Sequence, residues 1–476
     1  MKFRSPRLVN DVSGVQLPYA VSYWFIGVYI SSNAHKLEAA LIGTDSSSDG
    51  STVELRKSVS FDLPYEYSRA FSDFKFLVHD KNCLGKDCSS EKSVNNRRDG
   101  ITFSYQCGEK GGKHPCETGL ALLADLRNMT AVLQEEAVVD LLNKTDITAE
   151  RIVAIVLNTP AVWKTSESDK LQGISFGLND GLVLAQKTGI NVVDLQGTFD
   201  FTHVRQNIML LPYWILLDNG ENKNNKVLID LGNSARWFFI PSSSRVGGES
   251  WKKLQFKKIG PCGAFLDCIT NRITKGKNCV DVGGKLSVQG RCINELLMQW
   301  NRISSSIVLR GNSSFVASCD GSSCCLSEWG LDDRDENIYL ESLLKVLPDV
   351  VSVDTLCTAS QWIVEQIVTS IETYKISFGQ EPFDIVLAGA VKRNGLLLNK
   401  LTTALSPRPV YHLSDLFLGS EDSFDSVATA LLGLFTVLGK PVLYQKDGKI
   451  MKGTLGNLFC ASPKAWNLLT SFQVFC

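Results

Sequence analysis

The stretch DIVLAGAVKRNG at residues 384–395 decides the fold, and an apolar-periodic run follows it at residues 396–405. The apolar part predicts a short buried strand, the small residues predict a turn, and the periodic run predicts a helix. Gly389 and Ala390 allow a phosphate or nucleotide to approach the main chain closely. Backbone N–H groups and the positive end of the helix both favour an anion there. By itself, however, the stretch is also typical of an ordinary β–α crossover.

The composition is that of an ordinary globular protein. The chain has 476 residues, of which 44% are hydrophobic and 21% are charged, so we expect two or three domains. The formal net charge of −1 provides no field that would attract nucleic acid or an anionic membrane. No apolar run approaches the length of about 18 residues that spans a bilayer, and no apolar segment of a signal peptide follows the basic N-terminus. We therefore expect a cytoplasmic protein with neither nucleic acid nor membrane as a partner.

The chain contains fourteen cysteines, several of them clustered in polar stretches. A metal knuckle is one interpretation of the first cluster. Its spacings differ from the tight Cys-x2-Cys pair of most structural zinc sites, so we assign no metal ligand and expect mostly reduced thiols. The residues that would form the knuckle are Cys83, Cys88, Cys107, His114 and Cys116.

Strand and helix signals alternate along the chain. Residues 23–42 predict two strands, YWFIGVYI and LEAALI, joined by a polar turn. Residues 227–240 predict a second hairpin around Gly232 and Asn233. Because both halves begin with a strand–turn–strand element, we predict an α/β fold with two lobes and a central cleft. Further strands are expected at 152–157 and 190–195, helices at 118–142, 180–188, 264–272, 289–302, 353–374 and 423–438, and a polar loop at 304–335.

The polar run DNGENKNN at residues 218–225 is the best domain boundary. We place an N-terminal lobe at residues 1–218 and a C-terminal lobe at residues 226–476, which carries the candidate nucleotide loop at 384–395. Residues 79–116 are rich in Lys, Asn, Ser, Gly and Cys and have little periodicity. We expect them to form an inserted loop in the N-terminal lobe.

The block VVDLQGTFDFTHVRQNIMLLP at residues 192–212 aligns without gaps to the pattern V-V-x-D-F-R-x-x-D-V-x-x-G-G-Q-G-A-P-L-V-P. With this block, the chain resembles the anhydro-N-acetylmuramic acid kinases of the actin/sugar-kinase/Hsp70 ATPase superfamily over most of residues 24–440. Shorter matches support the resemblance. They are Gly260, Pro261 and Asp267 in a G-P-G-N-x-x-x-D segment, residues 289–291 in A-Q-G-R, and Gly389 and Asn394 in G-G-G-A-x-N.

The resemblance implies an actin-like ATPase (ribonuclease H-like) fold whose lobes hold ATP and Mg²⁺ beside a small sugar. It implies a base at Asp200, the position of the family's catalytic carboxylate, which would activate the nucleophile that receives the phosphoryl group. Family members are often dimers, so the resemblance also allows a homodimer or a protein partner. The nucleotide-binding positions implied by the motifs are Ser31, Ser32, Gly232, Gly260, Gly389 and Asn394.

The first phosphate loop departs from the family pattern. The family motif M-S-G-T-S-x-D-G-x-D corresponds to YISSNAHKLE at residues 29–38 of this chain. His35 therefore replaces the Asp that helps to bind the metal in the family, and Lys36 replaces the Gly that follows it. Lys36 can attract phosphate, but it cannot ligate Mg²⁺, which requires oxygen ligands. Other departures are Asn158-Thr159-Pro160-Ala161 for H-G-Q-T, Gly197 for Arg, residues 204–209 for G-G-Q-G-A-P, residues 229–232 for N-I-G-G, Gly263 for Asn and Lys258 for Asp.

Two hypotheses follow from this pattern. The favoured one is a kinase-like protein that has lost ordinary sugar-kinase turnover. Such a protein could still bind a nucleotide without transferring a phosphoryl group. Charge neutralisation at the phosphate is hard to replace once its residues are lost. The alternative is an active ATP-dependent phosphotransferase on a sugar or amino sugar, with Asp200 as its base and residues 389–394 as its nucleotide loop. The sequence specifies neither the sugar nor a partner.

Overall fold

The computed structural model describes most of the chain. Ser32, Asp200 and residues 80–114 of the expected insertion lie outside the described residues, so the expectations for them stay predictions. The described residues are 23–31, 34–44, 53–79, 115–165, 173–195, 208–218, 224–242, 253–278, 280–313, 333–378, 382–417, 419–440, 442–446, 449–453 and 456–475.

The first sheet has six strands in the order β15-β7-β4-β1-β2-β3. β1, β2 and β3 pair antiparallel, whereas β1 with β4 and β4 with β7 pair parallel. The sequences YWFIGVYI and IVAIVLN of β1 and β4 are almost wholly apolar, as expected for strands covered on both faces. The bounds are β1 (Tyr23–Ile30), β2 (Lys36–Thr44), β3 (Val53–Asp62), β4 (Ile152–Asn158), β7 (Val192–Asp194) and β15 (Asn457–Phe459).

The second sheet has five strands in the order β10-β9-β8-β11-β12. β8, β9 and β10 pair antiparallel, whereas β8 with β11 and β11 with β12 pair parallel. The expected hairpin around Gly232 and Asn233 is therefore confirmed as the β8–β9 turn. The bounds are β8 (Asn225–Leu231), β9 (Ser234–Ile240), β10 (Gln255–Pro261), β11 (Phe383–Ala388) and β12 (Val410–His412), and two separate hairpins are β5 (Ala161–Thr165) with β6 (Gly173–Gly177) and β13 (Val442–Lys446) with β14 (Lys449–Gly453).

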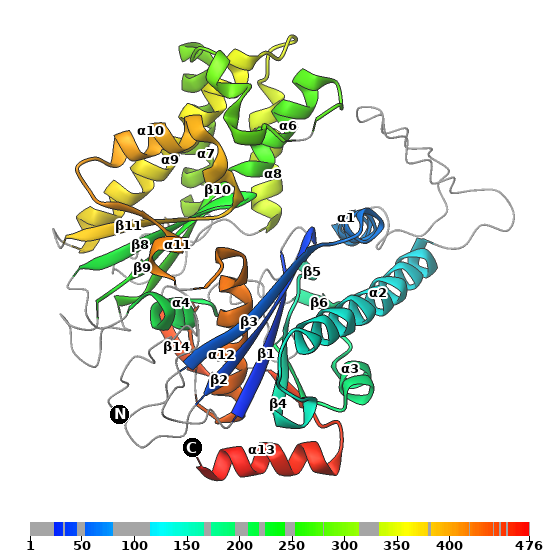
Figure 1. Ribbon diagram of the computed structural model, residues 1–476. Coiled ribbons are helices and arrows are strands. Elements are labelled where there is room, and N and C mark those ends of the chain that lie inside the picture. The colour runs from blue at the N-terminus through cyan, green and yellow to red at the C-terminus, as the bar shows by residue number, and fades with distance from the viewer. Residues whose placement is uncertain are drawn as a thin grey trace, which may run out of the picture.

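The two sheets repeat one topology. β3-β2-β1-β4-β7 and β10-β9-β8-β11-β12 have the same order, with three antiparallel strands followed by two parallel ones. Figure 1 shows the two sheets in separate halves of the molecule, each with helices beside it. This duplicated arrangement confirms the predicted two-lobed α/β fold of the actin-like ATPase type.

Helices cover the faces of both sheets. α2 packs against β1, β2 and β3, α12 packs against β1, β2 and β4, and α6 and α9 contact β9 of the second sheet. The α-helices are α1 (Tyr65–His79), α2 (Pro115–Asn143), α3 (Gly181–Thr188), α4 (Leu210–Leu217), α6 (Gly263–Thr274), α7 (Asn294–Ser313), α8 (Asp333–Lys345), α9 (Val353–Phe378), α10 (Gly395–Leu405), α11 (Leu413–Leu416), α12 (Phe424–Val437) and α13 (Pro463–Phe475). Short 3-10 helices include η1 (Ala149–Arg151), η4 (Val282–Gly284), η5 (Ser287–Gln289), η7 (Ala390–Arg393) and η8 (Glu421–Ser423).

Helix α12 joins the two lobes. Its sequence FDSVATALLGLFTV is apolar on all sides, and every residue except Asp425 and Thr436 is buried. One hydrophobic cluster contains α12 residues together with Phe25 of the first sheet and Phe238 of the second. The neighbouring residue Trp24 points to the other face of β1 and belongs to a separate cluster. The lobes therefore share a core, with α12 in its centre.

The predicted helix at 289–302 and the predicted polar loop at 304–335 were wrong in their bounds. α7 begins only at Asn294 and continues to Ser313, and α8 begins at Asp333. The late start has a local cause, because the preceding residues are tied to α9. The backbone N–H of Arg291 donates to Asp354 at 2.6 Å and that of Ile293 to Thr358 at 2.8 Å.

The chain returns to the first sheet after completing the second. β15 pairs antiparallel with β7, and α13 contacts β4. The expected boundary between residues 218 and 226 falls between α4 and β8, and the assignment of lobes at 1–218 and 226–476 stays a prediction. The last elements, β15 and α13, therefore pack with the first sheet, although they lie in the sequence range assigned to the C-terminal lobe.

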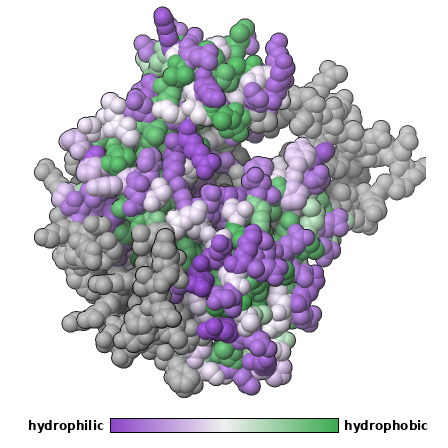
Figure 2. Space-filling view, in the orientation of Figure 1, coloured by the Kyte–Doolittle hydropathy of each residue, from purple (hydrophilic) through white to green (hydrophobic). Residues whose placement is uncertain are grey.

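The surface in Figure 2 carries hydrophilic residues interspersed with hydrophobic ones over both lobes. In the part of the chain that the structure describes, no helix has the length and apolar character needed to cross a membrane.

Two glycines allow α12 to lie directly on the first sheet. A Cβ at Gly27 would come within 2.0 Å of the Ser426 carbonyl oxygen, and one at Gly433 within 2.0 Å of Val156 Cγ2. We predict that Gly27→Ala and Gly433→Ala each lower the free energy of unfolding by about 1–3 kcal/mol, because helix and sheet must separate. Urea denaturation measures this change.

Gly119→Ala is the matched control, because no atom of the described residues lies within 4 Å of a Cβ built at Gly119 on helix α2. Helix propensity alone should leave that variant as stable as the wild type or more stable by up to about 1 kcal/mol. Equal stability of all three variants would contradict the close packing of α12.

Candidate functional site

The turn between β1 and β2 is held by hydrogen bonds between its own residues. The Ser31 hydroxyl accepts the backbone N–H of His35 at 3.2 Å and that of Lys36 at 3.0 Å, and the backbone N–H of Ser31 donates to the Lys36 carbonyl at 2.9 Å. Ala34 has a positive φ of 56° and donates its N–H to the Ser31 carbonyl at 2.8 Å. Among the described residues of this turn, the backbone donors of Ser31, Ala34, His35 and Lys36 therefore already have acceptors within the protein.

The N-terminus of α6 makes a similar arrangement in the second lobe. The backbone N–H of Gly263 donates to the Gly232 carbonyl at 3.0 Å, and those of Cys262 and Ala264 donate to the Asn233 carbonyl at 2.8 and 3.2 Å. The β8–β9 turn thus caps this helix with its own carbonyl oxygens. Because each of these three N–H groups has a protein acceptor, an incoming anion would have to displace the turn.

Gly389 and Asn394 both stabilise the turn after β11, Gly389 by close packing and Asn394 by capping a helix. Gly389 has a φ of 89°, and a Cβ there would lie 2.5 Å from the Leu231 carbonyl oxygen. The Asn394 side chain caps α10 by accepting the backbone N–H of Leu397 at 3.1 Å. Glycine is needed here for close packing of β11 on the β8–β9 hairpin, and Asn394 for starting the helix.

The structure brings part of the predicted set together. Gly389 packs against Leu231, the residue that precedes Gly232, so the two glycines lie near the same end of β8. Gly260 lies at an irregular position of β10, where a Cβ would come within 2.9 Å of Tyr339. Ser31 lies in the other lobe. Ser32 and the predicted base Asp200 lie outside the described residues, so their roles stay predictions.

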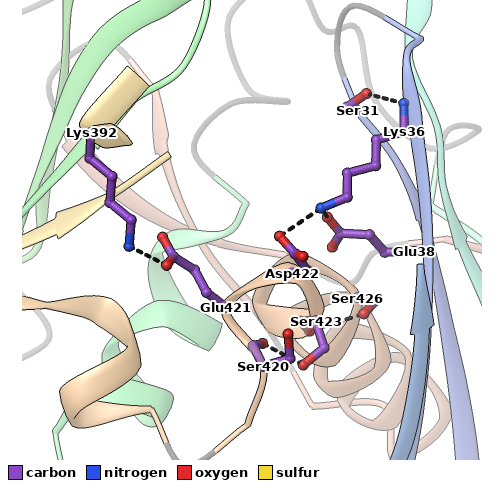
Figure 3. A network of polar contacts seen from close by, with 9 residues as sticks. All are labelled: Ser31, Lys36, Glu38, Lys392, Ser420, Glu421, Asp422, Ser423 and Ser426. Carbon is purple, nitrogen blue, oxygen red and sulfur yellow. Dashed lines mark hydrogen bonds and ion pairs between the residues drawn. The ribbon is translucent and has the colours of Figure 1, made fainter. Parts of the chain in front are cut away.

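Two lysines lie where the lobes approach each other, and each meets a carboxylate from η8. Lys36 Nζ of β2 lies 2.7 Å from Asp422 Oδ1, and Lys392 of η7 forms an ion pair with Glu421. Figure 3 shows the adjacent acids reaching in opposite directions, Glu421 toward Lys392 and Asp422 toward Lys36. The positive groups closest to the predicted phosphate site are thus neutralised by the protein itself.

A second group of polar side chains lies at the N-terminus of α12. The Tyr213 hydroxyl of α4 donates to Asp425 Oδ1 at 2.5 Å, and Arg236 of β9 forms an ion pair with Asp230 of β8 at 2.6 Å. Burial raises the pKa of Asp425 above its ordinary value. Burial and the Asp425 charge together raise the pKa of Tyr29 and of Tyr213. These tyrosines therefore stay protonated, and Tyr213 serves as a hydrogen-bond donor.

Glu38 is a buried acid at the same place. Burial, reinforced by the nearby Asp425 carboxylate, raises its pKa from 4.5 to about 9. The Lys36 ammonium lies 3.5 Å from Oε1 and lowers that pKa too little to offset burial. Oε2 is buried without a hydrogen-bond partner among the described residues. Glu38 is therefore a neutral carboxylic acid at pH 7.

This donor set does not fit Mg²⁺. A magnesium site requires ionised oxygen ligands, whereas Glu38 is protonated, Asp422 holds Lys36, and Asp425 accepts the Tyr213 hydroxyl. Within the described ranges, no three His, Cys, Asp or Glu side chains gather in a way that could hold a metal ion. The proposed knuckle residues Cys83, Cys88, Cys107 and His114 fall outside those ranges.

Sequence reasoning named Lys36, and Lys392 stands in the predicted nucleotide loop at residues 384–395. It missed their partners Glu421 and Asp422, because nothing in the local sequence indicates that η8 lies between the lobes. One signal was present for Glu38. It is a single acid in the strand sequence KLEAALIGT, whose other residues from Leu37 onward are buried. A lone acid in a buried strand indicates a perturbed pKa or a functional site.

We predict that Glu38→Gln removes a pH-dependent cost of folding. Because the folded-state pKa of about 9 exceeds the ordinary value of 4.5, the folded protein retains a proton that the unfolded chain loses as the pH rises between these values. Wild-type stability should therefore fall across this range, by up to about 1.4 kcal/mol per pH unit from this group. Denaturation of the wild type and the neutral variant from pH 5 to pH 9 measures the difference, and parallel curves would contradict a buried, protonated Glu38.

Comparison with known proteins places these features in an evolutionary context. No protein-family profile matches the chain. An anhydro-N-acetylmuramic acid kinase of Prochlorococcus marinus (strain MIT 9303) is 22% identical over 280 residues, which cover 59% of this chain and 69% of the relative. The enzyme of the same name from Cyanothece sp. is 23% identical over 271 residues, 56% of this chain and 64% of the relative. That from Synechococcus sp. (strain CC9605) is 22% identical over 240 residues, 50% of this chain and 59% of the relative.

Similar solved structures include an activator of 2-hydroxyisocaproyl-CoA dehydratase from Clostridium difficile with bound ADPNP. It is 10% identical, with a TM-score of 0.33 over 86% of this chain and 93% of that chain. A ROK hexokinase from Thermus thermophilus is 13% identical, with a TM-score of 0.32 over 86% of this chain and 99% of that chain. These TM-scores are too low to support any inference about function.

The sequence matches span between 59% and 69% of the length of these curated relatives. The chain is a distant homologue of the anhydro-N-acetylmuramic acid kinases.

Proposed function

We propose that this protein is a kinase homologue without sugar-kinase turnover, whose lobe junction binds anions weakly through lysine side chains. The observation that carries the proposal is that backbone donors beside the predicted phosphate positions already have protein acceptors: Ser31 accepts the N–H groups of His35 and Lys36, and the turn at Gly232 and Asn233 accepts those of residues 262–264 at the N-terminus of α6. In phosphoryl transfer such donors must be free to hold the phosphates in line with the acceptor. In this protein these backbone donors instead bond to acceptors of the protein's own turns.

Electrostatics support the same proposal. The developing charge on a transferred phosphoryl group requires preorganised cations or a metal ion. Lys36, Lys392 and Arg236 are cations at this place, and each is paired with an acid. The pKa of Glu38 is raised to about 9, and Asp425 already accepts the Tyr213 hydroxyl, so neither carboxyl offers the free ionised oxygens that Mg²⁺ requires.

Nucleotide binding without transfer is compatible with this arrangement. A triphosphate would meet two ammonium groups, each usable as a point charge without a metal ion. We expect ATP, if bound, to bind without a requirement for Mg²⁺. The alternative function is an ATP-dependent phosphotransferase acting on a sugar or amino sugar with Asp200 as base, which the homology to named kinases supports.

The test combines a melting curve with an ADP-release assay. We predict that ATP gives the same thermal stabilisation with Mg²⁺ as with EDTA, and that Mg-ATP with a panel of amino sugars and anhydro-sugars releases no ADP above background. A kinase that binds Mg-ATP at 100 times its Kd would gain about 2.7 kcal/mol of stability, which the melting curve resolves.

Asp200→Asn is the informative variant for the alternative. If wild-type protein releases ADP in a sugar-dependent manner and this variant does not, the chain is an active phosphotransferase and the proposal is wrong. ADP release that is the same in both proteins would instead remove Asp200 as the base while still contradicting the loss of turnover.

A further inference from the structure

The turn that contains Glu421 and Asp422 is fixed to the first lobe. η8 contacts β2 and β3, and a Cβ at Gly419 would lie 2.6 Å from Leu55 of β3. The Ser420 carbonyl accepts the backbone N–H of Ser423 at 2.8 Å and its hydroxyl at 2.6 Å. The turn therefore presents its two acids from a rigid base rather than from a mobile loop.

The two acids reach both sides of the lobe junction from this one base. Asp422 pairs with Lys36 of the same lobe, whereas Glu421 pairs with Lys392 on η7 of the second lobe. The Lys392 and Glu421 side chains are only 12% and 24% exposed, so solvent screens this pair less than an ordinary surface pair. The Lys36 and Asp422 side chains are 30% and 48% exposed, so their contact is the weaker one.

We propose that Glu421 and Asp422 act as a built-in competitor for the anion site, occupying the two lysines until a polyanionic ligand displaces them. The inference rests on the proposed function, since it takes Lys36 and Lys392 as the groups that bind the anion. Two carboxylates on adjacent residues offer the lysines what a di- or triphosphate would offer, which is negative oxygens at hydrogen-bond distance. A ligand phosphate and the acid pair cannot both hold the same ammonium groups at full strength.

Displacement has a mechanical consequence. The Glu421–Lys392 contact joins a turn fixed on the first lobe to the turn after β11 of the second lobe. An anion that takes Lys392 removes this contact between the lobes. Because the anion and Glu421 compete for the same ammonium group, removing the Glu421 carboxylate while keeping Lys392 should strengthen anion binding.

The decisive variant is the double substitution Glu421→Gln/Asp422→Asn, which removes both charges and preserves side-chain size. The probe is inorganic tripolyphosphate in buffer with EDTA, measured by isothermal titration calorimetry at low salt. We expect the variant to bind tripolyphosphate at least about fivefold more tightly than the wild type, the lower end of typical coupling between sites.

Asp125→Asn/Glu136→Gln is the matched control, because it removes two negative charges from exposed positions on helix α2. It should bind tripolyphosphate as the wild type does, which separates local competition from a change in net charge. In the background of the double variant, Lys36→Gln/Lys392→Gln should abolish the gain. Circular dichroism and melting curves establish that each variant is folded.

Equal or weaker binding by the double variant would overturn the competitor role, as would a gain that the α2 control reproduces. A variant that only melts at a lower temperature, without any gain in binding, would show that the ion pairs simply hold the lobes together, and would also overturn it. These results are separate from the ADP-release assay. The competitor role can fail while the loss of turnover stands, and sugar-dependent ADP release can occur whatever tripolyphosphate does.

Discussion

Helix α12 is buried between the first sheet and helix α4, which itself packs on β9 of the second sheet, and this packing governs how the lobes meet. Its residues are apolar on every side, so the helix has to be covered by both lobes at once. That requirement fixes where its N-terminal residues fall. Glu421, Asp422 and Asp425 therefore lie at the lobe junction, beside Lys36, Lys392 and Tyr213.

The polar chemistry of the junction follows from this placement. Acids that arrive with α12 pair with the lysines, and the Asp425 charge adds to the burial that raises the pKa of Glu38 on β2 and of Tyr213, which stays protonated as a donor. The turn before β2 and the N-terminus of α6 satisfy their own backbone donors. An ancestral kinase framework is thus compatible with a junction that the protein's own groups fill, because the fold depends on apolar packing and not on the bound ligand.

Much of the fold could be predicted because its signals are local. The hairpin around Gly232, the strand before Gly389 and the apolar helix α12 each have a clear period and clear turn residues. The site could be predicted less well, because its partners are distant in sequence. Gly389 and Asn394 match nucleotide positions but also serve packing and capping, and the contact of Lys392 with Glu421 depends on how the lobes meet. No periodicity encodes such a contact.

The most direct measurement of the central claim is a crystal structure of the protein with saturating Mg²⁺ and a non-hydrolysable ATP analogue. The account predicts that the His35 and Lys36 amides still donate to Ser31, and that the Gly263 amide still donates to the Gly232 carbonyl. Any bound phosphate should contact lysine side chains alone. Phosphate oxygens that accept these backbone amides beside an ordered Mg²⁺ would contradict the account.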